Sequence, residues 1–132
     1  MKYTIDERRQ RALAFRKEGR NCAQCVAMAF DDIAGADPQL LGRISAGFGG
    51  GFGAHGEVCG AVSGATMISG LAYDTLPRPE LYAKVRATMD AFGGLNGSYV
   101  CRELKHPGRK PCSELITDAV EILHRQLEAD GF

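Results

Sequence analysis

The sequence predicts a single all-α domain over residues 1–132, a compact bundle of five or six helices with a glycine-rich loop before the fourth helix. Helix-capping residues recur along the chain, and apolar residues follow each of them at the three- and four-residue spacing of one helix face. No stretch alternates apolar and polar residues as a half-buried strand does. A chain of 132 residues can bury one core and has little room for a second.

Capping boxes begin the first two helices. Thr4 and Glu7 form the first box, and the helix that follows is expected to run to about Lys17. Asn21 and Gln24 form the second box, and its helix is expected to end at residue 35, a glycine. These signals predict two consecutive helices joined by a short turn.

The third helix begins at Asp37-Pro38, where the aspartate caps and the proline needs no N–H partner, and it ends in the glycines from Gly47. The fourth is expected from near Val58 to near Tyr73. Small residues at 56, 60 and 64 fall on one of its faces and allow another backbone to approach, either within the domain or across a homodimer.

The remaining helices are shorter or end at the C-terminus. A fifth is expected from Pro79 to about Phe92, where Gly93-Gly94 should break it, and a short helical turn is expected over 99–104. The last helix should run from Pro111 to about residue 128. Its predicted buried face comprises Cys112, Leu115, Ile116, Ala119, Ile122, Leu123 and Leu127.

Charge and hydropathy narrow the class of protein. The 16 basic and 16 acidic residues are well mixed, so no basic stripe indicates nucleic-acid binding. No apolar run reaches the ~20 residues of a membrane span, and the charged N-terminus shows no signal peptide, so we expect a cytoplasmic protein without membrane contact. In that compartment five cysteines favour metal ligands or redox thiols over structural disulfides.

Three cysteines are predicted in the first turn of a helix. Unpaired N–H groups at a helix N-terminus lower the pKa of a thiol and stabilise the thiolate, which attacks disulfides and binds metals. These three are Cys22, Cys59 and Cys112. Cys101 and Cys112 flank a His-Pro-Gly loop, which could bring them together as ligands. Cys25 completes a CxxC with Cys22, either as a working partner or as a small buried residue.

The glycine-rich segment is expected to wrap tightly and to present backbone N–H groups to the cysteine site, with Gly49, Gly50 and Gly51 as the cofactor-contacting residues. A flexible linker is the alternative. The segment also matches GxGxxG, but no strand precedes it, so nucleotide binding is not expected. His55 is either a ligand or proton donor, or an exposed loop residue. Two other histidines are expected at the surface, His106 and His124.

The cysteine and glycine pattern resembles a known family. Asn21-Cys22-Ala23-Gln24, the run from Gly47 to Gly51, and the later cysteines resemble the redox-active proteins named after their own cysteine pattern, C_GCAxxG_C_C. The later segments are Cys59-Gly60-Ala61-Val62-Ser63-Gly64-Ala65, Cys101-Arg102-Glu103-Leu104 and Cys112. The resemblance assigns the four family cysteines to Cys22, Cys59, Cys101 and Cys112, and leaves Cys25 as a departure from the pattern.

The family is similar to the C-terminal region of split-Soret cytochromes, which are dimeric electron carriers that also hold an iron–sulfur cluster. The resemblance therefore implies cluster binding by these four cysteines, and electron transfer with a redox partner protein that the sequence does not identify. This chain lacks haem-attachment motifs, so only the cluster-binding part could apply.

Three hypotheses remain open from the sequence. The first is an iron–sulfur cluster that transfers electrons. The second is thiol–disulfide chemistry, in which Cys59 attacks and Cys22 or Cys112 resolves. The third is a structural zinc site or an oligomerising helical domain, although structural zinc cysteines usually occur in close pairs.

Overall fold

The all-α prediction is confirmed by the computed structural model, which describes residues 1–132. Eight α-helices and one 3-10 helix form the chain, and six of the α-helices have seven residues or more. The elements are α1 (Ile5–Lys17), α2 (Cys22–Ala29), α3 (Asp31–Ala34), α4 (Pro38–Ser45), η1 (Ala46–Phe48), α5 (Gly60–Ala72), α6 (Arg78–Asn96), α7 (Cys101–Leu104) and α8 (Cys112–Ala129).

Helix α2 lies at the centre of the core because it is apolar on nearly every side, with only Cys22 and Gln24 not fully buried. Helices α1, α4, α5 and α8 all pack against it. The approach of α5 depends on glycine, since a Cβ atom on Gly64 would lie 2.5 Å from the carbonyl oxygen of Ala23. The small-residue face of α5 is therefore used inside the domain.

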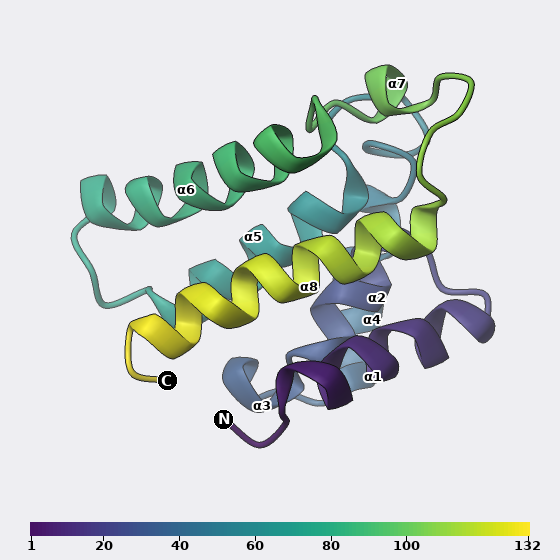
Figure 1. The fold of residues 1–132 in the computed structure, drawn as a ribbon. Helices are drawn as coiled ribbons and strands as arrows, with labels where there is room; N and C mark the ends of the chain where they lie inside the picture. The colour runs from purple at the N-terminus through teal and green to yellow at the C-terminus, as the bar shows by residue number, and fades with distance from the viewer.

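The long helices α1, α5 and α6 surround α8 (Figure 1). Both chain termini lie at one end of the molecule, and α7 lies at the other end together with the first turn of α8 (Figure 1). Cys101 begins α7 and Cys112 begins α8, so the predicted cysteine site lies at this second end. No helix is long and apolar enough to cross a membrane.

The two capping boxes form as predicted, but two helix boundaries differ from the sequence expectation. The expected helix over 21–35 is interrupted at Phe30, where the backbone of φ −110° and ψ 31° separates α2 from α3. The carbonyl of Ala29, the last residue of α2, accepts a hydrogen bond from the Arg8 guanidinium at 2.8 Å, which satisfies it without a further helical turn.

Helix α6 runs through the glycine pair that was expected to end it and stops instead at Gly97, which takes the left-handed conformation with φ +83°. A tertiary contact fills the space that Gly93 leaves, since a Cβ atom there would lie 3.3 Å from the Tyr99 ring. Packing therefore keeps helical a segment of low intrinsic helix propensity.

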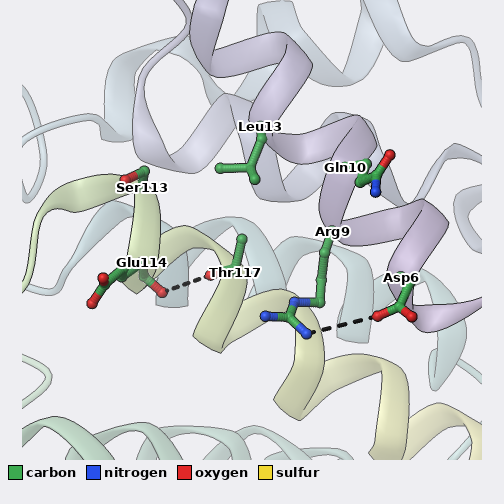
Figure 2. A pocket seen from close by; sticks show the side chains of 7 residues that line it. All are labelled: Asp6, Arg9, Gln10, Leu13, Ser113, Glu114 and Thr117. Carbon is green, nitrogen blue, oxygen red and sulfur yellow. Dashed lines mark hydrogen bonds and ion pairs between the residues drawn. The ribbon is translucent and has the colours of Figure 1, made fainter.

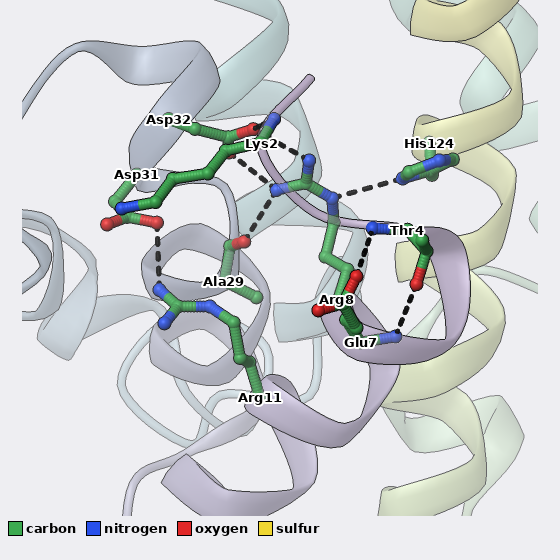
Figure 3. A network of polar contacts seen from close by, with 9 residues as sticks. All are labelled: Lys2, Thr4, Glu7, Arg8, Arg11, Ala29, Asp31, Asp32 and His124. Atoms are coloured by element: carbon green, nitrogen blue, oxygen red, sulfur yellow. Dashed lines mark hydrogen bonds and ion pairs between the residues drawn. The ribbon is translucent and has the colours of Figure 1, made fainter.

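A buried cation joins α1 to the rest of the core. Arg8 is completely buried, and its guanidinium donates to both carboxylate oxygens of Asp32 at 2.6 and 2.9 Å (Figure 3). It also lies 4.4 Å from the centre of the Phe30 ring and donates through Nε to His124. Every polar end of this buried side chain has a partner, as burial of a charge requires.

The prediction that His124 lies at the surface is wrong, because only 3% of this residue is exposed. Sequence analysis predicted only apolar residues on the buried face of α8. In the structure a hydrogen bond from the buried Arg8 satisfies the imidazole of His124, so this polar side chain can lie there as well. The other histidine expected at the surface, His106, is exposed.

Candidate functional site

Four cysteines from four separate elements line one pocket of about 190 Å³. Cys22, Cys101 and Cys112 are the first residues of α2, α7 and α8, and Cys59 is the N-cap of α5. The helix-start positions of three of them were predicted, and that of Cys101 is an addition. The four helix starts therefore meet at one end of the bundle.

A single β-bridge brings Cys59 and Cys101 together. Val58 pairs with Val100 in antiparallel orientation, and the backbone bonds on either side come from the two cysteines. The N–H of Cys59 donates to Tyr99 at 2.8 Å, and that of Cys101 donates to Glu57 at 2.6 Å. One bridged pair is too short to produce the alternating pattern that identifies a strand in a sequence.

The capping box fixes the start of α2, and Gly60 allows α5 to begin beside it. The Asn21 side chain accepts from the Gln24 N–H and donates to Ala46 at 2.9 Å, which ties this turn to η1. A Cβ atom on Gly60 would lie 3.3 Å from the Cβ atom of Cys22. The missing side chain of Gly60 therefore lets the thiol of Cys22 reach the same pocket as Cys59.

Cys22 and Cys112 form the outer pair of the pocket. Both are half-buried, and both line the same pocket. Cys59 and Cys101 lie deeper, at 3% and 9% exposed. A guanidinium nitrogen of Arg109 lies 3.9 Å from the Cys112 sulfur.

The glycine-rich loop is folded back on itself by its own backbone. N–H groups of residues 52–57 each donate to a carbonyl of residues 47–52, so the loop is a hydrogen-bonded structure and not a linker. Gly50 lines the pocket. Of the three glycines predicted to contact a cofactor, Gly49 and Gly51 do not line the pocket. The N–H groups of Gly49, Gly50 and Gly51 donate to no acceptor within the chain.

This loop needs glycine at Gly51, because the residue has φ +76° and a Cβ atom there would lie 2.5 Å from the Glu57 nitrogen and 2.9 Å from the Cβ atom of Cys101. Phe52 and Ala54 also adopt positive φ values of 67° and 62°, which costs free energy in residues with a Cβ atom. The loop therefore holds strained backbone within three residues of Gly51, which packs against Cys101.

Cys22 and Cys59 are not acidified by their helix-start positions, contrary to the sequence expectation. Burial, together with the neighbouring Cys112 and Cys59, raises the pKa of Cys22 to about 12, because the charged form is desolvated and like charges would lie close together. Burial also raises the pKa of Cys59, although the N–H groups of Ala61 and Val62 act in the opposite direction. Desolvation outweighs the helix terminus at both sulfurs.

Three cations surround the pocket and no carboxylate does. Arg16, Lys105 and Arg109 contribute to its lining, and none of them forms an ion pair with an acidic side chain. The whole chain has a formal charge of zero, so this positive charge is local. The sequence missed this group because only the fold brings Arg16 next to the segment that contains Lys105 and Arg109.

Two other candidates lie outside the pocket. Cys25 is completely buried, and its thiol donates to the Arg20 carbonyl at 3.6 Å, so it is placed as a core residue and does not pair with Cys22 at the site. Burial raises the pKa of Cys25 to about 11. His55 has 77% of its side chain exposed and contacts Glu57 at 3.1 Å.

The donor set of the pocket is four cysteine sulfurs. Thiolates are the ligands of iron–sulfur clusters and also of structural zinc. In this structure no three His, Cys, Asp or Glu side chains lie close enough together to hold one metal ion.

The other hollows carry no thiol. A groove of about 410 Å³ between α1 and α8 is lined almost entirely by polar side chains, among them Asp6, Arg9 and Glu114 (Figure 2). An apolar groove of about 350 Å³ lies between α5, α6 and the glycine-rich loop. Neither of these two grooves is lined by a cysteine.

A family model described as "Putative redox-active protein (C_GCAxxG_C_C)" matches residues 20–126. The matched region contains all four pocket cysteines and the whole glycine-rich loop. No curated protein and no solved structure matches the chain.

Proposed function

Because the chain belongs to the C_GCAxxG_C_C family of redox-active proteins, we propose that Cys22, Cys59, Cys101 and Cys112 bind an iron–sulfur cluster and that the protein transfers electrons to and from a partner protein. The observation that supports this most is the meeting of these four thiols at one pocket, while Cys25 stays in the core. Thiolates are the ligands that such clusters take.

A bound cluster would supply one-electron redox chemistry at the four sulfurs. The N–H group of Gly50, which lines the pocket and has no acceptor within the chain, can donate to a sulfur atom there and stabilise negative charge. Arg16, Lys105 and Arg109 offset the charge of four thiolates. The burial of Cys59 and Cys101 limits the access of water and oxygen to the inner ligands.

Ligand binding at these sulfurs requires loss of their protons. Since the pKa of Cys22 and that of Cys59 are raised, both thiols are protonated at neutral pH in the metal-free protein. Binding must therefore release protons, and loading should be faster and tighter as the pH rises.

The test is anaerobic purification followed by an ultraviolet–visible spectrum and by analysis of iron and acid-labile sulfide. We expect brown protein with both elements, and loss of the absorbance in each Cys→Ser variant at positions 22, 59, 101 and 112. Cys25→Ser is the matched control and should keep the cluster. Protein that stays colourless after reconstitution, or a cluster that needs Cys25, would contradict the proposal.

A further inference from the structure

The outer pair of thiols is arranged for chemistry that does not require a metal. Cys22 and Cys112 line the same pocket and are partly exposed to solvent, whereas Cys59 and Cys101 are buried. Two accessible thiols that share one pocket can form a disulfide with each other. This separates the outer pair from the buried inner pair.

The mouth of the pocket has a strong charge preference. Arg16 lies at the end of α1, Lys105 follows α7, and Arg109 lies in the loop before α8, so cations from three segments line the same opening. Arg16 and Lys105 are exposed, and no acidic side chain lines the pocket to neutralise them. A local excess of one sign attracts ligands of the opposite sign and repels those of the same sign.

We propose that the metal-free protein undergoes thiol–disulfide exchange with small anionic disulfides, with Cys112 as the attacking residue and Cys22 as the resolving residue. Arg109 makes Cys112 the attacking residue, because its guanidinium lies 3.9 Å from that sulfur and can hold a carboxylate of the substrate beside it. The substrate class is a low-molecular-weight disulfide that carries carboxylates. This reaction belongs to the metal-free protein, in which Cys22 and Cys112 are not occupied as ligands.

The exchange balances without another reactant. The Cys112 thiolate, whose proton has gone to solvent, attacks one sulfur of the substrate, forms a mixed disulfide and releases one thiolate that takes up a proton. The Cys22 sulfur, on losing its own proton, then attacks the Cys112 sulfur of the mixed disulfide and releases the second thiol. The two protein thiols are oxidised to one Cys22–Cys112 disulfide, and the substrate disulfide is reduced to two thiols.

The size of the pocket limits which part of the substrate enters. A volume of about 190 Å³ is smaller than the ~300 Å³ of a typical small-molecule site. Only the central S–S bond of the disulfide therefore reaches the thiols, and the two ends of the molecule stay outside. Its carboxylates then remain at the rim, where Arg16 and Lys105 are exposed. Charge at the ends of the molecule is therefore the property that the site selects.

The experiment uses reduced, metal-free, full-length protein and three probes that share the same bond but differ in charge: oxidised glutathione (anionic), hydroxyethyl disulfide (neutral) and cystamine (cationic). We expect oxidised glutathione to react at least about tenfold faster than cystamine at low ionic strength, with the difference shrinking at high salt. Cystamine reacting as fast as oxidised glutathione would overturn the proposal.

Variants and mapping assign the roles. Lys105→Gln and Arg109→Gln should slow the reaction with oxidised glutathione more than that with hydroxyethyl disulfide, whereas Arg86→Gln, on the exposed side of α6, should change neither. Cys22→Ser should trap the mixed disulfide on Cys112. Peptide mapping that finds the mixed disulfide or the final bond at Cys59 or Cys101 instead would contradict the assignment. Because no metal is present, a failed cluster reconstitution does not affect this result.

Discussion

The Nε atom of Arg8 donates a hydrogen bond to Nδ1 of His124 over 3.1 Å, which joins the first helix to the last inside the core (Figure 3). Since Nδ1 accepts, it carries no proton, and the imidazole is neutral in the folded protein. Burial lowers the pKa of His124, and the positive charge of Arg8 lowers it further.

This contact predicts loss of stability in mild acid. The folded protein binds a proton at His124 less readily than the unfolded chain, so the free energy of unfolding should fall as the pH drops below about 6.5, the ordinary histidine pKa. Urea unfolding between pH 7 and pH 5 measures this slope. His124→Gln, whose amide oxygen can accept from Arg8, should show a smaller slope.

His106→Gln is the matched control, because that histidine is exposed and should leave the slope unchanged. Asp32 adds a separate effect at lower pH. Burial would raise its pKa, but hydrogen bonds from Arg8 and Lys2 outweigh burial and lower the pKa to about 2, so its contribution is lost only between about pH 4 and pH 2. Equal slopes for wild type and His124→Gln above pH 5 would contradict the role of His124.

The contact between α2 and α5 predicts opposite effects for two glycines of one helix. Gly64→Ala should reduce the free energy of unfolding by about 1–3 kcal/mol, because the new Cβ atom would lie 2.5 Å from the Ala23 carbonyl oxygen, which cannot move alone. Gly70→Ala has no neighbour within 4 Å and should stabilise the helix by about 0.5–1 kcal/mol. Denaturant titration of both variants tests this, and equal effects would show that α5 does not pack as described.

The buried thiol of Cys25 predicts loss of stability in alkali. Burial raises its pKa to about 11 in the folded state, above the ~8.5 of a free thiol, so the unfolded chain ionises first and the folded state is disfavoured as pH rises from about 9 to about 11. Wild type should lose about 2 kcal/mol more than Cys25→Ala between pH 8 and pH 10.

The measurement is unfolding of reduced, metal-free protein at both pH values. Comparing the change with pH within each protein removes the cost of the substitution itself, and residues that ionise in both proteins cancel. The same pH dependence in the two proteins would mean that the Cys25 thiol is accessible to water.

Local signals in the sequence were enough to identify the helices. The capping boxes at Thr4 and Asn21 both form, because they depend only on side chains within three residues of each other. Boundaries that depend on tertiary contacts were missed: the interruption at Phe30 accompanies a hydrogen bond from Arg8, and the continuation of α6 past Gly93 accompanies packing on Tyr99.

The candidate site shows the same division. The family pattern selects the same four cysteines that line the pocket, and it sets Cys25 apart. The prediction that Cys22 and Cys59 have lowered pKa values was wrong. The position of a residue at a helix start is visible in a sequence, whereas desolvation and the approach of Cys112 to Cys22 are not. The rim cations Arg16 and Lys105 were missed because only the folded chain brings their segments together.

The four thiols that meet in the pocket are spread along the sequence from Cys22 to Cys112. Most of the chain therefore lies between the first and the last of them. Any group or bond that joins them acts as a cross-link, and it reduces the conformational freedom of the unfolded chain far more than that of the folded one. By chain-entropy arithmetic, closing a loop of this length stabilises a protein by about 4–5 kcal/mol. The redox or ligand state of one small pocket would thus be expressed in the resistance of the entire protein to heat, denaturant and proteases.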